Sequence, residues 1–315
     1  MSSHKRMQLR DLQPQFRRGL LRMPPVRLES RFLRGLTRML EPVLFRDAGD
    51  QQVHIQETEI GAAKVRVYTP IGQQSGCGLI WIHGGGMITG RASMNDRECR
   101  HLVNDLGAVV VSVDYRLAPE HIYPAAIDDC YEAWLWLQKS VDDFGVDRNR
   151  IAIAGQSAGG GLAAALCQRV LDSGGVQPVA QCLFYPMLDD RTAARQELDV
   201  VQHLGWNNLN NRYGWSAYLG HDVAQENLPE WAMPARREEL ANLPPAWIGV
   251  GELDLFYEEN LAYAHRLREA GVSCDVDVVA RAPHAFDLFV PGAEASKSFQ
   301  QGAWDFLRRY LCSSA

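Results

Sequence analysis

The chain has 315 residues, of which 46% are hydrophobic and 22% charged, which is the composition of a globular protein with a large core. Its net charge of −6 argues against nucleic acid as a partner. No stretch approaches the roughly 18 apolar residues of a membrane span. The N-terminus also lacks the apolar region of a signal peptide. We therefore expect no stable membrane insertion.

Seven cysteines are scattered through the chain without the C-x-x-C spacing of metal and redox sites. An odd number of cysteines without a secretion signal favours reduced thiols in a cytoplasmic protein. The sequence therefore predicts no metal site. It leaves open whether the chain forms a homodimer.

The N-terminal segment differs in charge from the remainder. Residues 1–46 contain eleven Lys/Arg and three Asp/Glu, a local net charge of +8. Such an arm could meet a membrane surface or an acidic partner, but a solvated basic face on a lid segment is the commoner case.

Two short helices are predicted in this segment, separated by Pro24-Pro25, with Pro42 ending the second. The second should carry apolar side chains on one face and arginines on another: Phe32, Leu36, Met39 and Leu40 on the first, Arg31, Arg34 and Arg38 on the other.

From about residue 52, short apolar runs alternate with helical periods. Continuous Val/Ile/Leu-rich runs are typical of parallel strands covered on both faces. The predicted strands are Lys64–Tyr68, Gly78–Ile82, Ala108–Asp114, Arg150–Gly155, Gln181–Tyr185, Ala246–Gly251 and Cys274–Val279. The predicted helices include Pro124–Ser140, Ala158–Leu171 and Ser296–Leu311. This alternation predicts an α/β fold, with a mostly parallel central sheet flanked by helices.

One region breaks the alternation. Between Asp190 and about Pro244 no strand pattern is visible, and aromatic side chains accumulate: Trp206, Tyr213, Trp215, Tyr218 and Trp231. An aromatic insertion after a core strand is typical of a lid over a pocket, although such side chains often pack only among themselves. We therefore expect a catalytic domain at 51–315, with a cap built from residues 1–50 and an insertion at 190–240.

A G-x-S-x-G pattern at residues 155–159 lies between the strand predicted at Arg150–Gly155 and the helix predicted at Ala158–Leu171. In this strand–turn–helix context the pattern is typical of a nucleophile elbow, here carrying Ser157. The glycines fit because the turn is too crowded for side chains two positions either side of the serine. The helix N-terminus would also favour a developing oxyanion. The alternative is a plain structural turn, since Gly and Ser are common in turns.

His83-Gly84-Gly85-Gly86 follows the strand predicted at Gly78–Ile82. Three glycines at a strand end leave backbone N–H groups able to approach a ligand, as an oxyanion hole requires. Such a loop is the known partner of the serine elbow in esterases. We expect His83 to be a structural hydrogen-bonding residue, because the catalytic base should come last in the chain.

The order expected for this arrangement is Ser, then acid, then His. His284 follows the last predicted strand, and Asp254 follows the strand before it. Glu252 is the rival acid, two residues away, and Asp189 and Asp190 are weaker rivals. Other histidines fall in helical or lid patterns and are expected at the surface: His101, His203 and His265.

Residues 52–315 resemble the hormone-sensitive-lipase-like (bacterial family IV) carboxylesterases. The motifs that carry the resemblance occur in the family's order: HGGG at 83–86, DYRLAPEH at 114–121, YPAAIDD at 123–129, GQSAGGG at 155–161, GELDLFYEEN at 251–260 and HAF at 284–286. The resemblance implies the α/β-hydrolase fold with a helical cap. It also implies hydrolysis of short-to-medium acyl esters through an acyl-enzyme, without a cofactor.

The same resemblance implies roles for individual residues: Ser157 as nucleophile, Asp254 as triad acid, His284 as base, and Gly85, Gly86 and Ala158 as oxyanion donors, with Gly84 in the same oxyanion hole. Two residues depart from the family pattern. Gln156 stands where the residue before the nucleophile is often acidic, and Leu255 where a proline usually follows the acid. Neither removes a triad group, but Gln156 leaves the rate and pH optimum open.

Three other functions stay open on the sequence alone. Amidases, peptidases and lactonases share this scaffold, because fold and triad do not fix the substrate. The intact triad argues against an inactive ligand-binding protein. The absence of a long apolar lid argues against a lipase acting at an oil interface. We therefore expect a serine carboxylesterase acting on a small-molecule ester.

Overall fold

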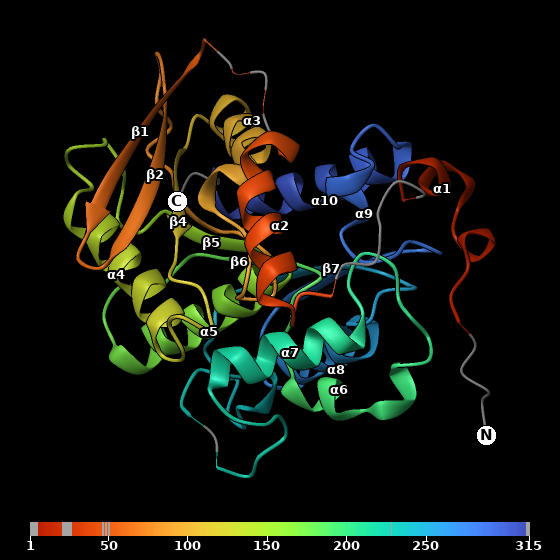
Figure 1. Ribbon diagram of the computed structural model, residues 1–315. Coiled ribbons are helices and arrows are strands. Elements are labelled where there is room, and N and C mark those ends of the chain that lie inside the picture. The colour runs from red at the N-terminus through yellow and green to blue at the C-terminus, as the bar shows by residue number, and fades with distance from the viewer. Residues whose placement is uncertain are drawn as a thin grey trace.

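The computed structural model describes residues 6–20, 27–45, 47, 49, 51–227 and 229–312. Eight strands form one sheet in the order β1-β2-β4-β3-β5-β6-β7-β8 (Figure 1). The strands are β1 (Val53–Ile60), β2 (Ala63–Pro70), β3 (Gly78–Ile82), β4 (Val109–Asp114), β5 (Ile151–Gln156), β6 (Gln181–Phe184), β7 (Ala246–Gly251) and β8 (Cys274–Val279). β2 is antiparallel to both β1 and β4, and the other pairs are parallel. The predicted mostly parallel sheet is confirmed.

Helices cover both faces of this sheet. The longer ones are α2 (Arg31–Leu44), α3 (Asp96–Leu106), α4 (Ala125–Lys139), α5 (Ala158–Ser173), α7 (Asn208–Leu219), α8 (Tyr257–Glu269) and α10 (Glu294–Leu311). The shorter ones are α1 (Pro14–Leu20), α6 (Asp190–Ala194) and α9 (Phe286–Phe289), with single turns η1 (Leu9–Asp11), η2 (Ala92–Asn95), η3 (Gln196–Leu198) and η4 (Pro234–Arg236). None of the helices in the described part of the chain is long and apolar enough to cross a membrane.

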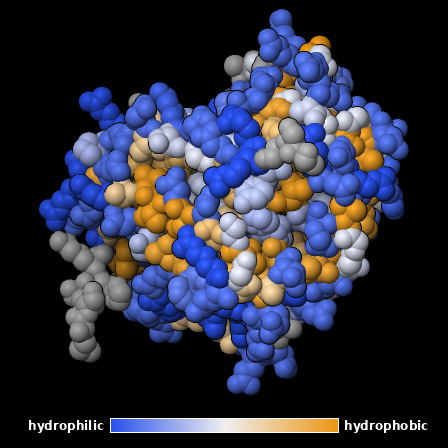
Figure 2. Space-filling model, turned by 180° about the vertical axis from the view of Figure 1, so that it is seen from behind, coloured by the Kyte–Doolittle hydropathy of each residue, from blue (hydrophilic) through white to orange (hydrophobic). Residues whose placement is uncertain are grey.

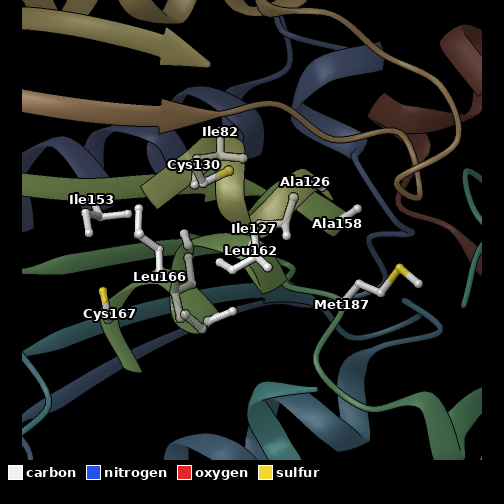
Figure 3. Packing of buried hydrophobic residues seen from close by; sticks show 14 of the residues in the cluster. Ile82, Ala126, Ile127, Cys130, Ile153, Ala158, Leu162, Leu166, Cys167 and Met187 are labelled. Carbon is white, nitrogen blue, oxygen red and sulfur yellow. The ribbon is translucent and has the colours of Figure 1, made fainter. Parts of the chain in front are cut away.

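Two apolar clusters form the core, one on each face of the sheet, because successive side chains of a strand point to opposite faces. On β3, Ile80 and Ile82 join the cluster of α4, α5 and α8, whereas Leu79 and Trp81 join that of α3 and α10. Figure 3 shows the first cluster, with Ile82 packed near side chains of α4 and α5. Small residues such as Ala163 and Ala164 let α5 lie close to the strands. Seen from behind the view of Figure 1, the surface is mainly hydrophilic, with hydrophobic patches among the hydrophilic residues (Figure 2).

The sequence pattern missed β1. Its side chains alternate between polar and apolar, as in His54 and Ile55, and it forms the exposed edge of the sheet. An edge strand with one solvated face lacks the continuous apolar run that marks the central strands. The boundaries of β3, β7 and β8 agree with the prediction, and the other predicted strands are shifted by one or two residues.

The prediction that Pro42 ends the second N-terminal helix is wrong, because α2 continues to Leu44. A proline in the last turn removes a single helical N–H donor, and the Phe45 N–H still closes that turn on the carbonyl of Glu41. Pro24-Pro25 lies outside the described residues.

The expectation that the basic face of α2 is solvated holds for Arg31 but not for Arg34, which is buried, or Arg38, which is half-buried. Arg34 and Glu41 are each only 4% exposed, whereas Phe32 and Val43 on the opposite face are 77% and 73% exposed. The polar face therefore points into the protein. One reason is α7, which lies beside α2 in Figure 1: Arg34 donates a hydrogen bond to the Tyr213 hydroxyl across 2.8 Å.

Candidate active site

The turn between β5 and α5 places Ser157 at the carboxyl end of the sheet, with φ +56° and ψ −120°. The glycines around it permit this turn. A Cβ on Gly155 would overlap the Gly159 carbonyl, and one on Gly159 would overlap the Ile82 and His83 carbonyls. Close backbone approach thus explains why glycine stands on both sides of the serine.

The structure brings Ser157, Asp254 and His284 together, and all three are buried. His284 Nε2 lies 2.8 Å from Ser157 Oγ, and its Nδ1 lies 2.8 Å from an Asp254 carboxylate oxygen. With a neutral imidazole, Nδ1–H donates to Asp254 and Nε2 accepts from the serine hydroxyl. The other Asp254 oxygen accepts from the Phe256 N–H at 2.9 Å, which fixes the carboxylate.

Two aromatic rings hold the imidazole of His284. Tyr185 packs edge-on at 4.9 Å between ring centroids, and Phe256 does so at 5.2 Å. The loop that carries His284 lies so close to the end of β7 that a Cβ on Gly251 would overlap the Ala282 carbonyl. The ring is therefore oriented by packing as well as by its hydrogen bonds.

The rival groups have other partners. Glu252 accepts a hydrogen bond from the Arg281 N–H at 2.8 Å. Asp189 pairs with Arg191, and Asp190 pairs with Arg236. Of the other histidines, which the sequence predicts at the surface, His101 and His265 are exposed and His203 is half-buried.

Residues 84–90 form a tight turn, the glycine loop, directly beside Ser157. Gly85 and Gly86 have φ values of +115° and +63°, which glycine adopts most readily. A Cβ on Gly84 would lie 3.3 Å from that of Ser157. Within the described residues, the N–H groups of Gly85, Gly86 and Ala158 donate no hydrogen bond. Donors close to the serine are thus free to bind an anionic oxygen.

His83 is buried, and burial lowers the pKa of its imidazole. Its Nδ1 lies 2.7 Å from the Gly84 carbonyl, and its ring stacks on Tyr115 at 4.2 Å. These contacts agree with the structural role expected for His83.

Gln156, before the serine, joins a buried polar group under the elbow. Asn95 Nδ2 donates to Gln156 Oε1 at 2.8 Å and lies 3.5 Å from a Glu98 oxygen. Asn95, Glu98 and Tyr185 are not predicted from the sequence, because each reaches the site from a distant part of the chain and no local motif marks them. Phe256 lies within the GELDLFYEEN motif, but its sequence context does not predict that its ring packs on His284.

Of the aromatic residues in the 190–240 insertion, Trp206 reaches the glycine loop. A Cβ on Gly86 would overlap the Trp206 ring, and one on the neighbouring Gly205 would overlap the His284 carbonyl. Trp215 and Tyr218 are fully buried and pack 6.2 Å apart in the core. Only part of the aromatic group therefore lies at the site.

Comparison with known proteins gives the same picture. A family model described as the alpha/beta hydrolase fold matches residues 79–288. Esterase LipI of Mycobacterium tuberculosis is 37% identical over 210 residues, which cover 66% of this chain and 65% of LipI. Carboxylesterase NlhH of the same organism is 34% identical over 254 residues, which cover 77% of this chain and 79% of NlhH.

Solved structures agree over nearly the whole length. A bacterial heroin esterase has a TM-score of 0.89 at 33% identity, covering 97% of this chain and 99% of its own. Esterase LipW from Mycobacterium marinum has a TM-score of 0.87 at 30% identity, covering 99% of this chain and 100% of its own. By family match, sheet order and these relatives, the chain belongs to the hormone-sensitive-lipase-like carboxylesterases of the α/β-hydrolase fold and is a carboxylic-ester hydrolase.

Proposed function

We propose that the chain is a serine carboxylesterase that cleaves short-to-medium acyl esters through an acyl-enzyme formed on Ser157. The observation that carries this proposal is the continuous hydrogen-bonded series from Ser157 Oγ through His284 to Asp254, with both contacts at 2.8 Å. A neutral serine hydroxyl is a poor nucleophile, and an adjacent base within hydrogen-bond distance activates it.

In the first half-reaction, Ser157 Oγ attacks the ester carbonyl carbon while its proton moves to His284 Nε2. Asp254 holds the imidazole in the required tautomer and stabilises the imidazolium. The oxyanion accepts hydrogen bonds from the N–H groups of Gly85, Gly86 and Ala158, with Gly84 shaping the same loop. Each such donor lowers the barrier by about 3 to 4 kcal/mol.

Collapse of the tetrahedral intermediate breaks the bond to the alcohol, which leaves with the proton from His284. Water then attacks the acyl-enzyme with His284 as base, and the acid is released while Ser157 regains its proton. The balance is one water consumed per ester cleaved.

Residues 1–50 and the 190–240 insertion form a cap over this site in our proposal. Its support is the packing of the Trp206 ring on Gly86 and the hydrogen bond that joins α2 to α7. A wall of this kind would line the acyl pocket and exclude water during acylation.

Substitution of the nucleophile tests the proposal. Ser157→Ala should lower turnover of p-nitrophenyl butyrate by several orders of magnitude while ester binding persists. A fluorophosphonate should label one serine per chain, and peptide mapping should locate it at Ser157. Wild-type turnover by Ser157→Ala would reject the mechanism.

Substrate class needs separate probes, because the triad alone permits amide and lactone cleavage. We expect rapid turnover of p-nitrophenyl butyrate and slow turnover of both the palmitate ester and a butyryl anilide. Faster palmitate cleavage above its solubility limit would identify a lipase instead. Comparable anilide cleavage would identify an amidase.

A further inference from the structure

Two polar side chains of α2, Glu41 and Arg38, contact backbone groups at the C-terminal end of the glycine loop. Glu41 Oε1 accepts a hydrogen bond from the Gly90 N–H across 2.9 Å. Arg38 Nε donates to the Ile88 carbonyl and its Nη2 donates to the Ala118 carbonyl, both at 2.9 Å. Glu41 is buried, and this burial raises its pKa against the opposing effect of the Gly90 N–H. The N-terminal helix is thus bonded directly to a loop about fifty positions away in the chain.

Within the loop, Gly90 and Thr89 in turn contact the glycines beside Ser157. Gly90 has φ +98°, and a Cβ there would overlap the Gly84 carbonyl and approach the His83 ring. Thr89 donates to the Gly85 carbonyl through both its N–H and its hydroxyl, each at 3.0 Å. A displacement of Gly90 therefore cannot leave Gly84 and Gly85 in place, because close-packed backbone has no free volume to absorb it.

We propose that Glu41 and Arg38 are positioning residues that hold the glycine loop in its oxyanion-binding geometry. The inference rests on the proposed function of that loop. Oxyanion donors act on charge that develops in the transition state, so a displaced loop lowers kcat much more than it raises KM. A purely structural anchor for α2 would instead affect stability or substrate affinity.

Substitution of Glu41 separates these cases. Glu41→Ala removes the acceptor for the Gly90 N–H, and we expect kcat to fall about 10-fold to 100-fold with KM changed less than about threefold. Glu41→Gln keeps an amide oxygen in the same place and should retain kcat within about threefold. Met39→Ala is the matched control, because Met39 lies on the same helix but is 67% exposed. Wild-type kcat in a folded Glu41→Ala variant, or a rise in KM alone, would overturn the inference.

Substitution of Arg38 tests the same positioning role independently and still applies if Glu41→Ala does not fold. Arg38→Met removes the bonds to the Ile88 and Ala118 carbonyls without burying a new polar group, and the same loss of kcat is expected. Glu120→Gln is its control, because Glu120 pairs with the same guanidinium at 3.0 Å and is half exposed. Unchanged kcat in Arg38→Met would overturn the inference.

The failure of this inference is distinguishable from failure of the proposed function. Absent turnover in the wild-type chain, or normal turnover in Ser157→Ala, would reject the function itself. Normal wild-type turnover combined with unaffected Glu41→Ala and Arg38→Met variants would reject only the positioning role. The rate of fluorophosphonate labelling gives a second readout, since its phosphoryl oxygen uses the same donors, and it should fall with kcat.

Discussion

The hydroxyl of Tyr185 donates a hydrogen bond to the carboxylate of Asp287 across 2.8 Å, in a fully buried position behind His284. Gln300 donates to the second carboxylate oxygen at 3.1 Å. Tyr185 also packs edge-on against the His284 ring. Burial raises the pKa of Asp287 to about 6 despite these donors. A buried titratable group thus holds the Tyr185 ring that packs on His284.

This shift predicts a pH dependence of stability. The folded-state pKa of Asp287 lies above its ordinary value of 3.8, so the folded chain binds the proton more tightly than the unfolded chain. The contribution of Asp287 to the free energy of unfolding should therefore fall as pH rises from about 4 to about 6 and change no further above that. The size of this contribution is on the order of 3 kcal/mol.

Asp287→Asn isolates this contribution, because the amide oxygen still accepts from Tyr185 and no charge is buried. Urea unfolding at pH 4 and pH 7.5 should show the variant gaining stability relative to wild type only at the higher pH, by about 2 to 3 kcal/mol. Other carboxylates titrate equally in both chains and cancel. An equal difference at the two pH values would contradict the assignment.

The acid of the proposed triad can be tested against its neighbour Glu252. Asp254→Asn should lower kcat by about 10⁴-fold, because the amide favours the wrong tautomer of His284. Glu252→Gln should stay within about threefold of wild type, since its amide oxygen can still accept from the Arg281 N–H. Steady-state kinetics on p-nitrophenyl butyrate decide between them. A disabled Glu252→Gln variant with an active Asp254→Asn variant would reverse the assignment.

The contacts of Gln156 predict an energetic coupling between positions 156 and 98, beneath the turn that carries Ser157. Gln156→Glu would place a second carboxylate beside Glu98, with both oxygens sharing the Asn95 amide. Two buried carboxylates in one site cannot both ionise without cost, so we expect a loss of about 1 to 3 kcal/mol in unfolding free energy at pH 8 and a smaller loss at pH 5.

Combining this change with Glu98→Gln should restore much of the loss, because the pair then carries a single charge. The four chains form a double-mutant cycle, and urea unfolding should give a coupling energy of at least about 0.5 kcal/mol. Additive effects of the two changes would show that the carboxylates do not interact.

The parts of the molecule that the sequence predicts are those with a local physical signature. Gly78–Ile82 is an uninterrupted apolar run, and Ser157 sits in a turn that glycines must make, so both are recognisable without coordinates. Chain order then predicts that His284 and Asp254 meet the serine. Asn95 and Tyr185 carry no such signature, because their roles depend on how distant segments pack.

The N-terminal helix shows why burial is the hardest feature to predict. Amphipathic periodicity in α2 is correct, but the pattern alone does not say which face meets the protein. The buried face is polar because Arg38 and Glu41 bond to backbone groups of the glycine loop, which no local pattern reveals.

The proposed cap predicts that acyl-chain preference depends on Trp206, because its ring lies against Gly86, next to Ser157. Trp206→Ala should open space there and shift the ratio of kcat/KM for C8 over C2 p-nitrophenyl esters upward, by about 10-fold or more. Trp231→Phe is the matched control, since Trp231 belongs to the same insertion but bonds to Asp172 away from the serine. A C8/C2 ratio unchanged in Trp206→Ala would place the acyl pocket elsewhere.

Deletion of residues 1–40 tests the N-terminal half of the proposed cap. The deletion removes Arg38 and most of α2, so we expect lower kcat and altered preference across C2 to C10 esters. Ser157 should still react with a small fluorophosphonate, more slowly than in wild type, because the triad lies on β5, β7 and β8 loops that the deletion leaves intact. Circular dichroism and thermal unfolding establish that the variant is folded. A folded deletion variant with wild-type kinetics on every ester would show that the N-terminal segment takes no part in the substrate site.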